Sequence, residues 1–267
     1  MLLAVLGLLL SVTISCGDAK SPEPGAPDDR IEADILVFAA SSLTDAFDAL
    51  AEGFRVEHPA ISVTFNYASS SALATQINER APTDVFASAN DAQMKIVTVA
   101  GNASDPQTFA TNVPVIVVPA GSKAVASLAD LAVPGVRLVL AGPDVPIGAY
   151  SRQVLGNAAD AADGPGADFA DRVLANLKSN ESNVRAVLTK VQLGEADAGI
   201  VYQTDVALAG DDVEVIQIPA AYNVVASYPI AVTKESRNPA AAAAWIAYVL
   251  SPEGQAVLQR FGFGPRP

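Results

Sequence analysis

Short apolar runs alternate with amphipathic stretches along this chain, and this alternation limits the possible folds more than any other feature. The apolar run Asp34–Phe38 is followed by Leu43, Phe47, Leu50 and Phe54, which share one face of a predicted helix that opens at Ser42. The series continues with predicted strands at 61–67 and 84–87 and predicted helices at 71–80 and 91–99. This strand–helix–strand order predicts an α/β fold with a mostly parallel sheet and helices on its faces.

Small hydroxyl residues occupy two of the points where a predicted strand passes into a helix. The segment Phe38–Thr44 reads Phe-Ala-Ala-Ser-Ser-Leu-Thr, and Ala68–Leu73 reads Ala-Ser-Ser-Ser-Ala-Leu. A helix N-terminus offers unpaired backbone N–H groups and the positive end of a dipole, so it can hold an anion without a cation. We interpret the two junctions as half of a site for a small oxyanion. Taken singly, Ser42 would be interpreted as a helix N-cap only, and Ser69–Ser71 as a polar turn.

Two β-rich stretches predict a second domain inserted into the first. Asn112–Pro119 is interpreted as a strand that crosses into it, and Ser227–Val232 as a strand that crosses back. The other elements expected are helices at 128–131, from about 149, at 169–177, 183–192, 239–250 and 252–261, and strands at 137–141, 198–202 and 213–218. We expect a first lobe of residues 34–112 plus 227–267 and a second of 113–226. A cleft between two such lobes is a common ligand site.

The beginning of the chain predicts export. Residues 1–16 are interpreted as a signal peptide, because the apolar run Leu2–Ile14 is shorter than the ~20 residues of a membrane span. The segment Val12–Gly17 resembles a bacterial lipoprotein processing site and predicts lipidation of Cys16; an ordinary signal sequence is the alternative. Residues 17–33 are rich in proline and predict a flexible tether. The expected location is extracytoplasmic, with membrane contact through the lipid anchor only.

Charge and cysteine content exclude several classes of function. The net charge is −13, from 16 basic and 29 acidic residues, which argues against nucleic-acid binding because such binding depends on Lys and Arg contacts to phosphate. A single cysteine and a single histidine allow neither a disulfide within the chain nor a Cys/His metal cluster. No cofactor and no direct metal ligand are therefore expected.

Seven segments, in order along the chain, carry a resemblance to a known family. They are Val37–Thr44, Ala68–Leu73, Ala81–Ala89, Val145–Tyr150, Asn183–Arg185, Gly199–Tyr202 and Tyr228–Val232. On these segments the chain resembles the periplasmic molybdate-binding proteins of ABC-type importers, over roughly 34–262. The resemblance implies the two-lobed type II periplasmic-binding-protein fold. It also implies a monomeric binding protein, not an enzyme, that delivers molybdate, and tungstate as well, to a membrane permease.

The resemblance also implies which residues hold the ligand. Ser42 and Ser70 would donate from the first lobe, Ile147 and Val184 would donate backbone N–H groups from the second, and Tyr202 would donate its phenol O–H. The family usually has alanine at the position of Ile147, a change that a main-chain donor should tolerate. Taken singly, Val184 and Tyr202 would be assigned to the core. Arg185 is interpreted as a solvated residue or a bridge between the lobes, outside the ligand set.

Elementary chemistry agrees with a set of neutral donors. A fully ionised tetrahedral dianion can only accept hydrogen bonds, so its site should contain donors and no ionised carboxylate. Phosphate carries a proton at neutral pH and needs an acceptor, which this set does not provide as an ion. Sulfate remains open as an alternative ligand, because cavity size would have to exclude it. A serine hydrolase is the distant alternative: the sequence has no Gly-x-Ser-x-Gly elbow, and His58 is its only candidate base.

Overall fold

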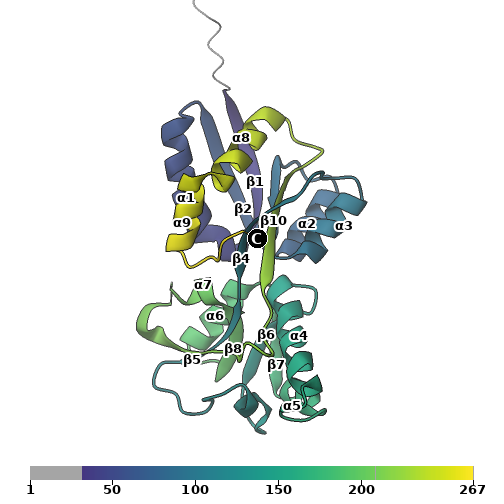
Figure 1. The fold of residues 1–267 in the computed structure, drawn as a ribbon, viewed down its shortest axis with the longest axis vertical. Helices are drawn as coiled ribbons and strands as arrows, with labels where there is room; N and C mark the ends of the chain where they lie inside the picture. The colour runs from purple at the N-terminus through teal and green to yellow at the C-terminus, as the bar shows by residue number, and fades with distance from the viewer. Residues whose placement is uncertain (1–31, 208, 267) are drawn as a thin grey trace, which may run out of the picture. The chain divides into compact units, whose positions relative to one another are not determined.

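The first of two β-sheets contains the chain's opening strands and one strand from near its end. The computed structural model describes residues 32–207 and 209–266 (Figure 1). The strand order is β2-β1-β3-β10-β4, and β10 alone runs antiparallel to both of its neighbours. The strands are β1 (Ala33–Ala40), β2 (Ile61–Ala68), β3 (Val85–Ala87), β4 (Gln107–Asn112) and β10 (Ala226–Val232). The predictions for the signal peptide, Cys16 and most of the tether lie outside the described residues.

The second sheet repeats this arrangement with different strands. Its order is β7-β6-β8-β5-β9, and β5 is the strand antiparallel to both neighbours. The strands are β5 (Pro114–Pro119), β6 (Leu138–Ala141), β7 (Leu177–Glu181), β8 (Ala198–Tyr202) and β9 (Val213–Ile216). The chain enters this sheet between β4 and β5 and leaves it between β9 and β10. Both sheets belong to one compact unit of the chain. Below, each sheet with its helices is called the first or the second lobe.

Helices flank both sheets, which confirms the α/β two-lobed fold class. The first lobe has α1 (Thr44–Glu57), α2 (Ser70–Asn78), α3 (Asp91–Val99), α8 (Pro239–Leu250) and α9 (Pro252–Arg260). The second has α4 (Pro146–Asp160), α5 (Phe169–Ala175), α6 (Val184–Gln192) and the short α7 (Gln203–Val206). Short 3-10 turns lie at Ser41–Leu43, Ala129–Ala132 and Gly210–Asp212. In Figure 1, α1, α8 and α9 lie on one side of the first sheet and α2 and α3 on the other. None of the described helices combines the length and apolar character that a membrane crossing requires.

Aromatic side chains hold the first lobe together. The Trp245 ring, on α8, packs edge-on against Phe47 and Phe54 of α1, with ring centroids 5.7 and 5.3 Å apart. All three side chains are fully buried. Burying one such side chain contributes roughly 1.5–3 kcal/mol. This packing fixes α1, and therefore the junction before it, against the sheet.

Several predicted element boundaries are wrong. Nearly all of the predicted crossing strand Asn112–Pro119 is β5 of the second sheet, and only Asn112 belongs to the first, as the last residue of β4. The sequence did not suggest β4 itself, which starts at Gln107. The predicted helix 169–177 ends at Ala175, and the missed strand β7 follows it. Strand β7 is polar and half-exposed at the edge of its sheet, so it lacks the apolar pattern of a buried strand. Helix α4 begins at Pro146, earlier than expected, because proline suits the first turn of a helix.

Candidate functional site

Four strand-to-helix junctions converge on one pocket between the two lobes. All five predicted ligand-binding residues line it: Ser42, Ser70, Ile147, Val184 and Tyr202. The rest of its lining is Ala40, Ser41, Ser69, Ala89, Val145 and Pro146. Among the residues that the structure describes, no charged side chain lines the pocket. The pocket lies beyond the carboxyl ends of the parallel strands, where open α/β sheets usually bind ligands.

Strand register explains why these junctions meet. In the first sheet Ala40, the last residue of β1, pairs with Ala68, the last residue of β2. In the second, Ala141 at the end of β6 pairs with Glu181 at the end of β7. In each pair of neighbouring strands, the two strands therefore end side by side. The four helices that follow them begin around the same space. Gly148 allows α4 to begin close to β6, because a Cβ atom there would lie 1.9 Å from the Gly142 carbonyl oxygen.

The first lobe contributes serine hydroxyls that already have protein partners. Ser70 is buried at the start of α2, and its Oγ accepts a hydrogen bond from the Ala89 backbone N–H at 2.9 Å. A backbone amide can only donate, so the Ser70 hydroxyl keeps its own proton for another acceptor. Ser42 Oγ lies 3.0 Å from the Tyr228 hydroxyl. The neighbouring Ser69 caps α2 by accepting from the Ala72 N–H, so the Ser70 hydroxyl is not needed as the cap of that helix.

The second lobe contributes two apolar residues to the pocket lining, each at the start of a helix. Ile147 is in the first turn of α4, and Val184 is the first residue of α6. The N–H groups of a helix's first turn have no carbonyl of that helix to bond. Asn183 caps α6 by accepting a hydrogen bond from the Ala186 N–H at 3.0 Å, so this cap does not use the Val184 N–H. The side chains of Ile147 and Val184 are buried, as expected for Val184 taken singly, and both residues line the pocket.

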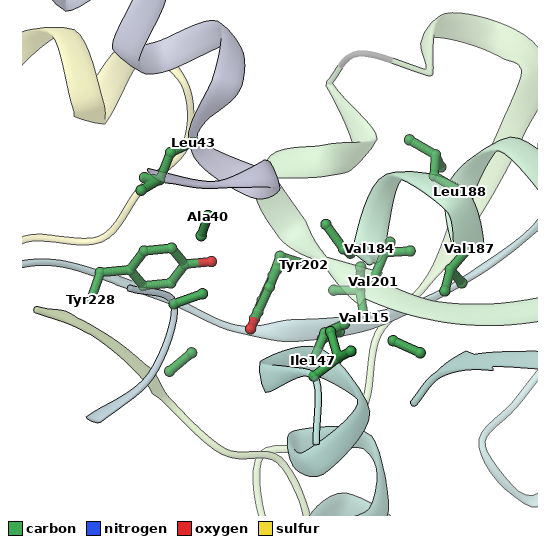
Figure 2. Packing of buried hydrophobic residues seen from close by; sticks show 14 of the residues in the cluster. Ala40, Leu43, Val115, Ile147, Val184, Val187, Leu188, Val201, Tyr202 and Tyr228 are labelled. Carbon is green, nitrogen blue, oxygen red and sulfur yellow. The ribbon is translucent and has the colours of Figure 1, made fainter. Parts of the chain in front are cut away.

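Tyr202 brings a phenol to the pocket from the end of β8. Its side chain is buried, and its hydroxyl has no hydrogen-bond partner among the described residues. Burial raises the pKa of the Tyr202 phenol well above its usual value, so the hydroxyl stays protonated and can donate. Its ring packs edge-on against Tyr228, with centroids 5.8 Å apart (Figure 2). A buried unpaired hydroxyl is costly, which marks Tyr202 as a donor that suits a ligand.

The pocket is small in this conformation. Its cavity volume is about 10 Å³, which is close to the minimum needed to hold one water molecule. A four-oxygen ion therefore needs the walls to move apart slightly, or the lobes to open and close around it. Gln93 of α3 donates to the Asp144 carbonyl oxygen at 3.0 Å, so the two lobes are in contact beside the pocket.

Arg185 bridges the two lobes and does not line the pocket, which confirms its interpretation as a bridge. Its guanidinium lies 2.7 Å from Asp45 on α1 and 3.0 Å from Asp205 on α7. Asp205 is fully buried, and it accepts from the Tyr202 backbone N–H at 3.0 Å. Burial raises the pKa of Asp205 to about 7, against the opposing effect of the Arg185 charge. One cation thus connects α6, which bears Val184, with α1 and α7, the helices that directly follow the turn containing Ser42 and the strand ending at Tyr202.

His58 lies far from Ser42 and Ser70, the two proposed serine donors; it precedes the eight-residue strand β2, whereas Ser70 follows that strand. It follows the C-terminus of α1, whereas Ser42 precedes the N-terminus of that helix. The 14 residues of α1 separate them by roughly 20 Å. The His58 ring packs against Phe54, with centroids 4.5 Å apart. This arrangement gives neither serine a general base, so it does not favour the hydrolase alternative.

Two residues next to the pocket were not predicted to have a role. Tyr228 of β10 contacts Ser42, and Asn112 at the end of β4 contacts Tyr228. Both are buried polar side chains in the strands that connect the lobes. A polar group within or at the end of an apolar crossing strand was the signal that could have found them.

Comparison with known proteins establishes the family. Residues 35–264 match the family of bacterial extracellular solute-binding proteins, and the chain belongs to this family. The class is thus a binding protein that acts outside the cytoplasm. The chain is 38% identical over 262 residues to the molybdate-binding protein ModA of Mycobacterium tuberculosis, covering 97% of this chain and 95% of that protein.

Solved structures with lower identity share the fold. The periplasmic molybdate-binding protein of Azotobacter vinelandii superposes with a TM-score of 0.75 at 21% identity, over 87% of this chain and 100% of that one. The sulfate-binding protein SubI of M. tuberculosis superposes with a TM-score of 0.79 at 19% identity, over 87% of each chain. At these identities the likeness concerns the fold alone.

Proposed function

We propose that this protein captures molybdate, and tungstate equally, for an ABC importer and passes it to the membrane permease. The observation that carries the proposal is a pocket bordered by neutral donors and free of charged side chains among the described residues. An acceptor-only dianion matches such a pocket, and each hydrogen bond to a charged group contributes about 1.5–3 kcal/mol. The 38% identity to the mycobacterial ModA protein supports molybdate as the ligand.

Ser42, Ser70 and Tyr202 donate their hydroxyl protons in this proposal, and Ile147 and Val184 donate backbone N–H groups. The lobes, at boundaries 34–112 plus 227–267 and 113–226, close about the connections between β4 and β5 and between β9 and β10. Closure brings the donors of both lobes onto one ion. The protein acts as a monomer without catalysis, and lipidation of Cys16 keeps it at the membrane.

Isothermal titration calorimetry on the full chain tests the ligand. Molybdate and tungstate should bind tightly, with sulfate much weaker and phosphate undetectable. Tight sulfate binding with weak molybdate binding would reassign the ligand within the same class, since sulfate is also an acceptor-only dianion. Strong binding of phosphate or of an amino acid would overturn the proposal. His58→Ala should leave every affinity unchanged, because His58 lies at the opposite end of α1.

A further inference from the structure

The side-chain amide of Asn112 has a defined orientation. Its Oδ1 accepts from the Val113 backbone N–H at 2.9 Å. A backbone N–H can only donate, so the atom facing it must be the oxygen and not the nitrogen of the amide. The Asn112 Nδ2 therefore faces the other way, 2.8 Å from Thr204 Oγ1 and 3.5 Å from the Tyr228 hydroxyl.

This orientation determines what the Tyr228 hydroxyl can do. Tyr228 is fully buried, and burial raises its pKa, so its oxygen keeps its proton. Among the described residues, the two groups in hydrogen-bond geometry with its oxygen are Asn112 Nδ2 and Ser42 Oγ, and the Tyr202 phenol lies nearby. An amide NH₂ cannot accept, so of the two bonded groups only Ser42 Oγ can accept the Tyr228 proton. A buried O–H that did not donate would pay the cost of an unmade hydrogen bond.

We propose that Tyr228 and Asn112 are positioning residues that direct the Ser42 hydroxyl proton into the pocket. Ser42 Oγ accepts from Tyr228, so its proton is left for an acceptor elsewhere, and Ser42 lines the pocket. The sequence of donors is Asn112 Nδ2, Tyr228 O–H, Ser42 O–H and then the ligand. The proposal rests on the proposed function, because it concerns how the same pocket selects its oxyanion. Ser70 reaches the same state through the Ala89 N–H.

Proton direction has a consequence for selectivity. A protonated oxyanion such as hydrogen phosphate must donate its own proton to some acceptor in the pocket. Ser42 Oγ has two lone pairs, and one of them accepts from Tyr228. If the other accepted the ligand's proton, the Ser42 hydroxyl proton would need an acceptor other than that ligand oxygen, and turning it back towards Tyr228 would leave the buried Tyr228 proton without an acceptor between Ser42 and Asn112. The pocket therefore rejects protonated ligands through a hydrogen-bond relay from Asn112 through Tyr228 to Ser42, of which only Ser42 would contact the ligand.

Tyr228→Phe tests the relay, with affinities for molybdate and inorganic phosphate measured by calorimetry and by competition. We expect molybdate affinity to fall by roughly three- to tenfold, because Ser42 loses the donor that orients and polarises it. Phosphate affinity should rise, so the ratio of molybdate affinity to phosphate affinity should fall by roughly tenfold or more. The matched control is Tyr222→Phe, whose hydroxyl bonds the Asp163 carbonyl oxygen away from the pocket and which should change neither affinity.

A double-mutant cycle separates this role from general packing. If Tyr228 acts only through Ser42, Tyr228→Phe should have no further effect on either affinity in a Ser42→Ala background. Equal effects of Tyr228→Phe in both backgrounds would overturn the inference.

Asn112→Asp is a second variant, used in case Tyr228→Phe does not fold. It places an acceptor opposite Tyr228, so Ser42 should turn to donate to Tyr228 and the affinity ratio should narrow again. An unchanged ratio in Asn112→Asp, or in a folded Tyr228→Phe protein, would also overturn the inference. Failure of the wild-type protein to bind molybdate would instead refute the proposed function.

Discussion

The two lobes present the same topology to the pocket but different chemistry. In the first lobe the proposed donors are serine side chains, and both hydroxyl oxygens are also bonded within the protein, to Tyr228 and to the Ala89 N–H. In the second lobe the proposed donors are main-chain groups of Ile147 and Val184, together with a Tyr202 phenol that has no partner among the described residues.

In the proposed binding mode, this difference couples binding to folding in the first lobe and separates them in the second. A first-lobe hydroxyl bonds a buried group of the fold, and in the proposal it also donates its proton to the ligand. In the second lobe, helix geometry supplies the amides, so the side chains at those positions are free to pack in the core. Substitutions in the two lobes should therefore change binding and stability in different combinations.

Ser70→Ala should have the largest combined effect. Ligand affinity should fall by about 1.5–3 kcal/mol, because a charged acceptor loses a donor. The free energy of unfolding should also fall by about 1–3 kcal/mol, because the buried Ala89 N–H loses its acceptor. Calorimetry and urea denaturation of the ligand-free protein measure the two effects. Unchanged stability would show that the Ala89 N–H finds another partner.

Tyr202→Phe should weaken binding by a similar amount without loss of stability. Affinity should fall by about 1.5–3 kcal/mol, or roughly ten- to a hundredfold. The ligand-free protein should be as stable as the wild type or slightly more so, because the removed hydroxyl made no hydrogen bond to the described residues. The same two measurements apply. A stability loss as large as that of Ser70→Ala would remove the contrast between the lobes.

The buried carboxyl behind Tyr202 should make stability depend on pH. The pKa of Asp205 is about 7 in the folded protein, against an ordinary value of 3.8; the groups that face it are the Arg185 cation, the Tyr202 N–H and the Asp45 carboxylate. Between these values the folded state binds more protons than the unfolded state, so the free energy of unfolding falls as pH rises from about 4 to about 7. Asp205→Asn should flatten this slope in denaturation curves, and equal slopes would contradict the assignment.

Arg185→Gln should weaken binding modestly through faster ligand release. The ion pair with Asp45 joins the lobes, and its exposure limits its contribution to binding to about 0.5–1 kcal/mol. The free energy of unfolding should fall as well, because the buried Asp205 carboxyl loses its cation. Stopped-flow fluorescence should show a higher dissociation rate, with a smaller change in the association rate. The matched control is Arg137→Gln, which breaks the 2.6 Å pair with Asp197 inside the second lobe and should leave the rates unchanged. Equal effects in both variants would show that Arg185 does not hold the lobes together.

Ile147→Val should have the smallest effect on binding. The ligand contact assigned to this position is main chain, so affinity should stay within about twofold of the wild type. Stability should fall by about 0.5–1.5 kcal/mol, because the side chain is buried in the core. Calorimetry and denaturation again separate the two effects. A large loss of affinity would mean that the side chain itself shapes the pocket.

Much of the fold was predictable because it depends on local patterns. Helices α3 and α8 and strand β8 have the bounds that were predicted, since their periodicity and capping residues are visible in the sequence. Strands β4 and β7 were missed because sheet pairing stabilises them more than their own composition does. The five proposed ligand residues came from motifs and a family resemblance, and the structure gathers them around one pocket. Their roles as ligand contacts stay proposals.

The sequence by itself determined the alternation of strands and helices, the hydroxyl residues at two helix starts and the absence of histidine from the motifs that form the site. Only the tertiary structure decided which atoms those hydroxyls contact. Ser42 and Tyr228 are 186 residues apart in the chain, and Asn112 and Thr204 are 92 apart. Helix and strand signals act between near neighbours, whereas the direction of a hydroxyl proton depends on partners that sheet register brings together from distant segments.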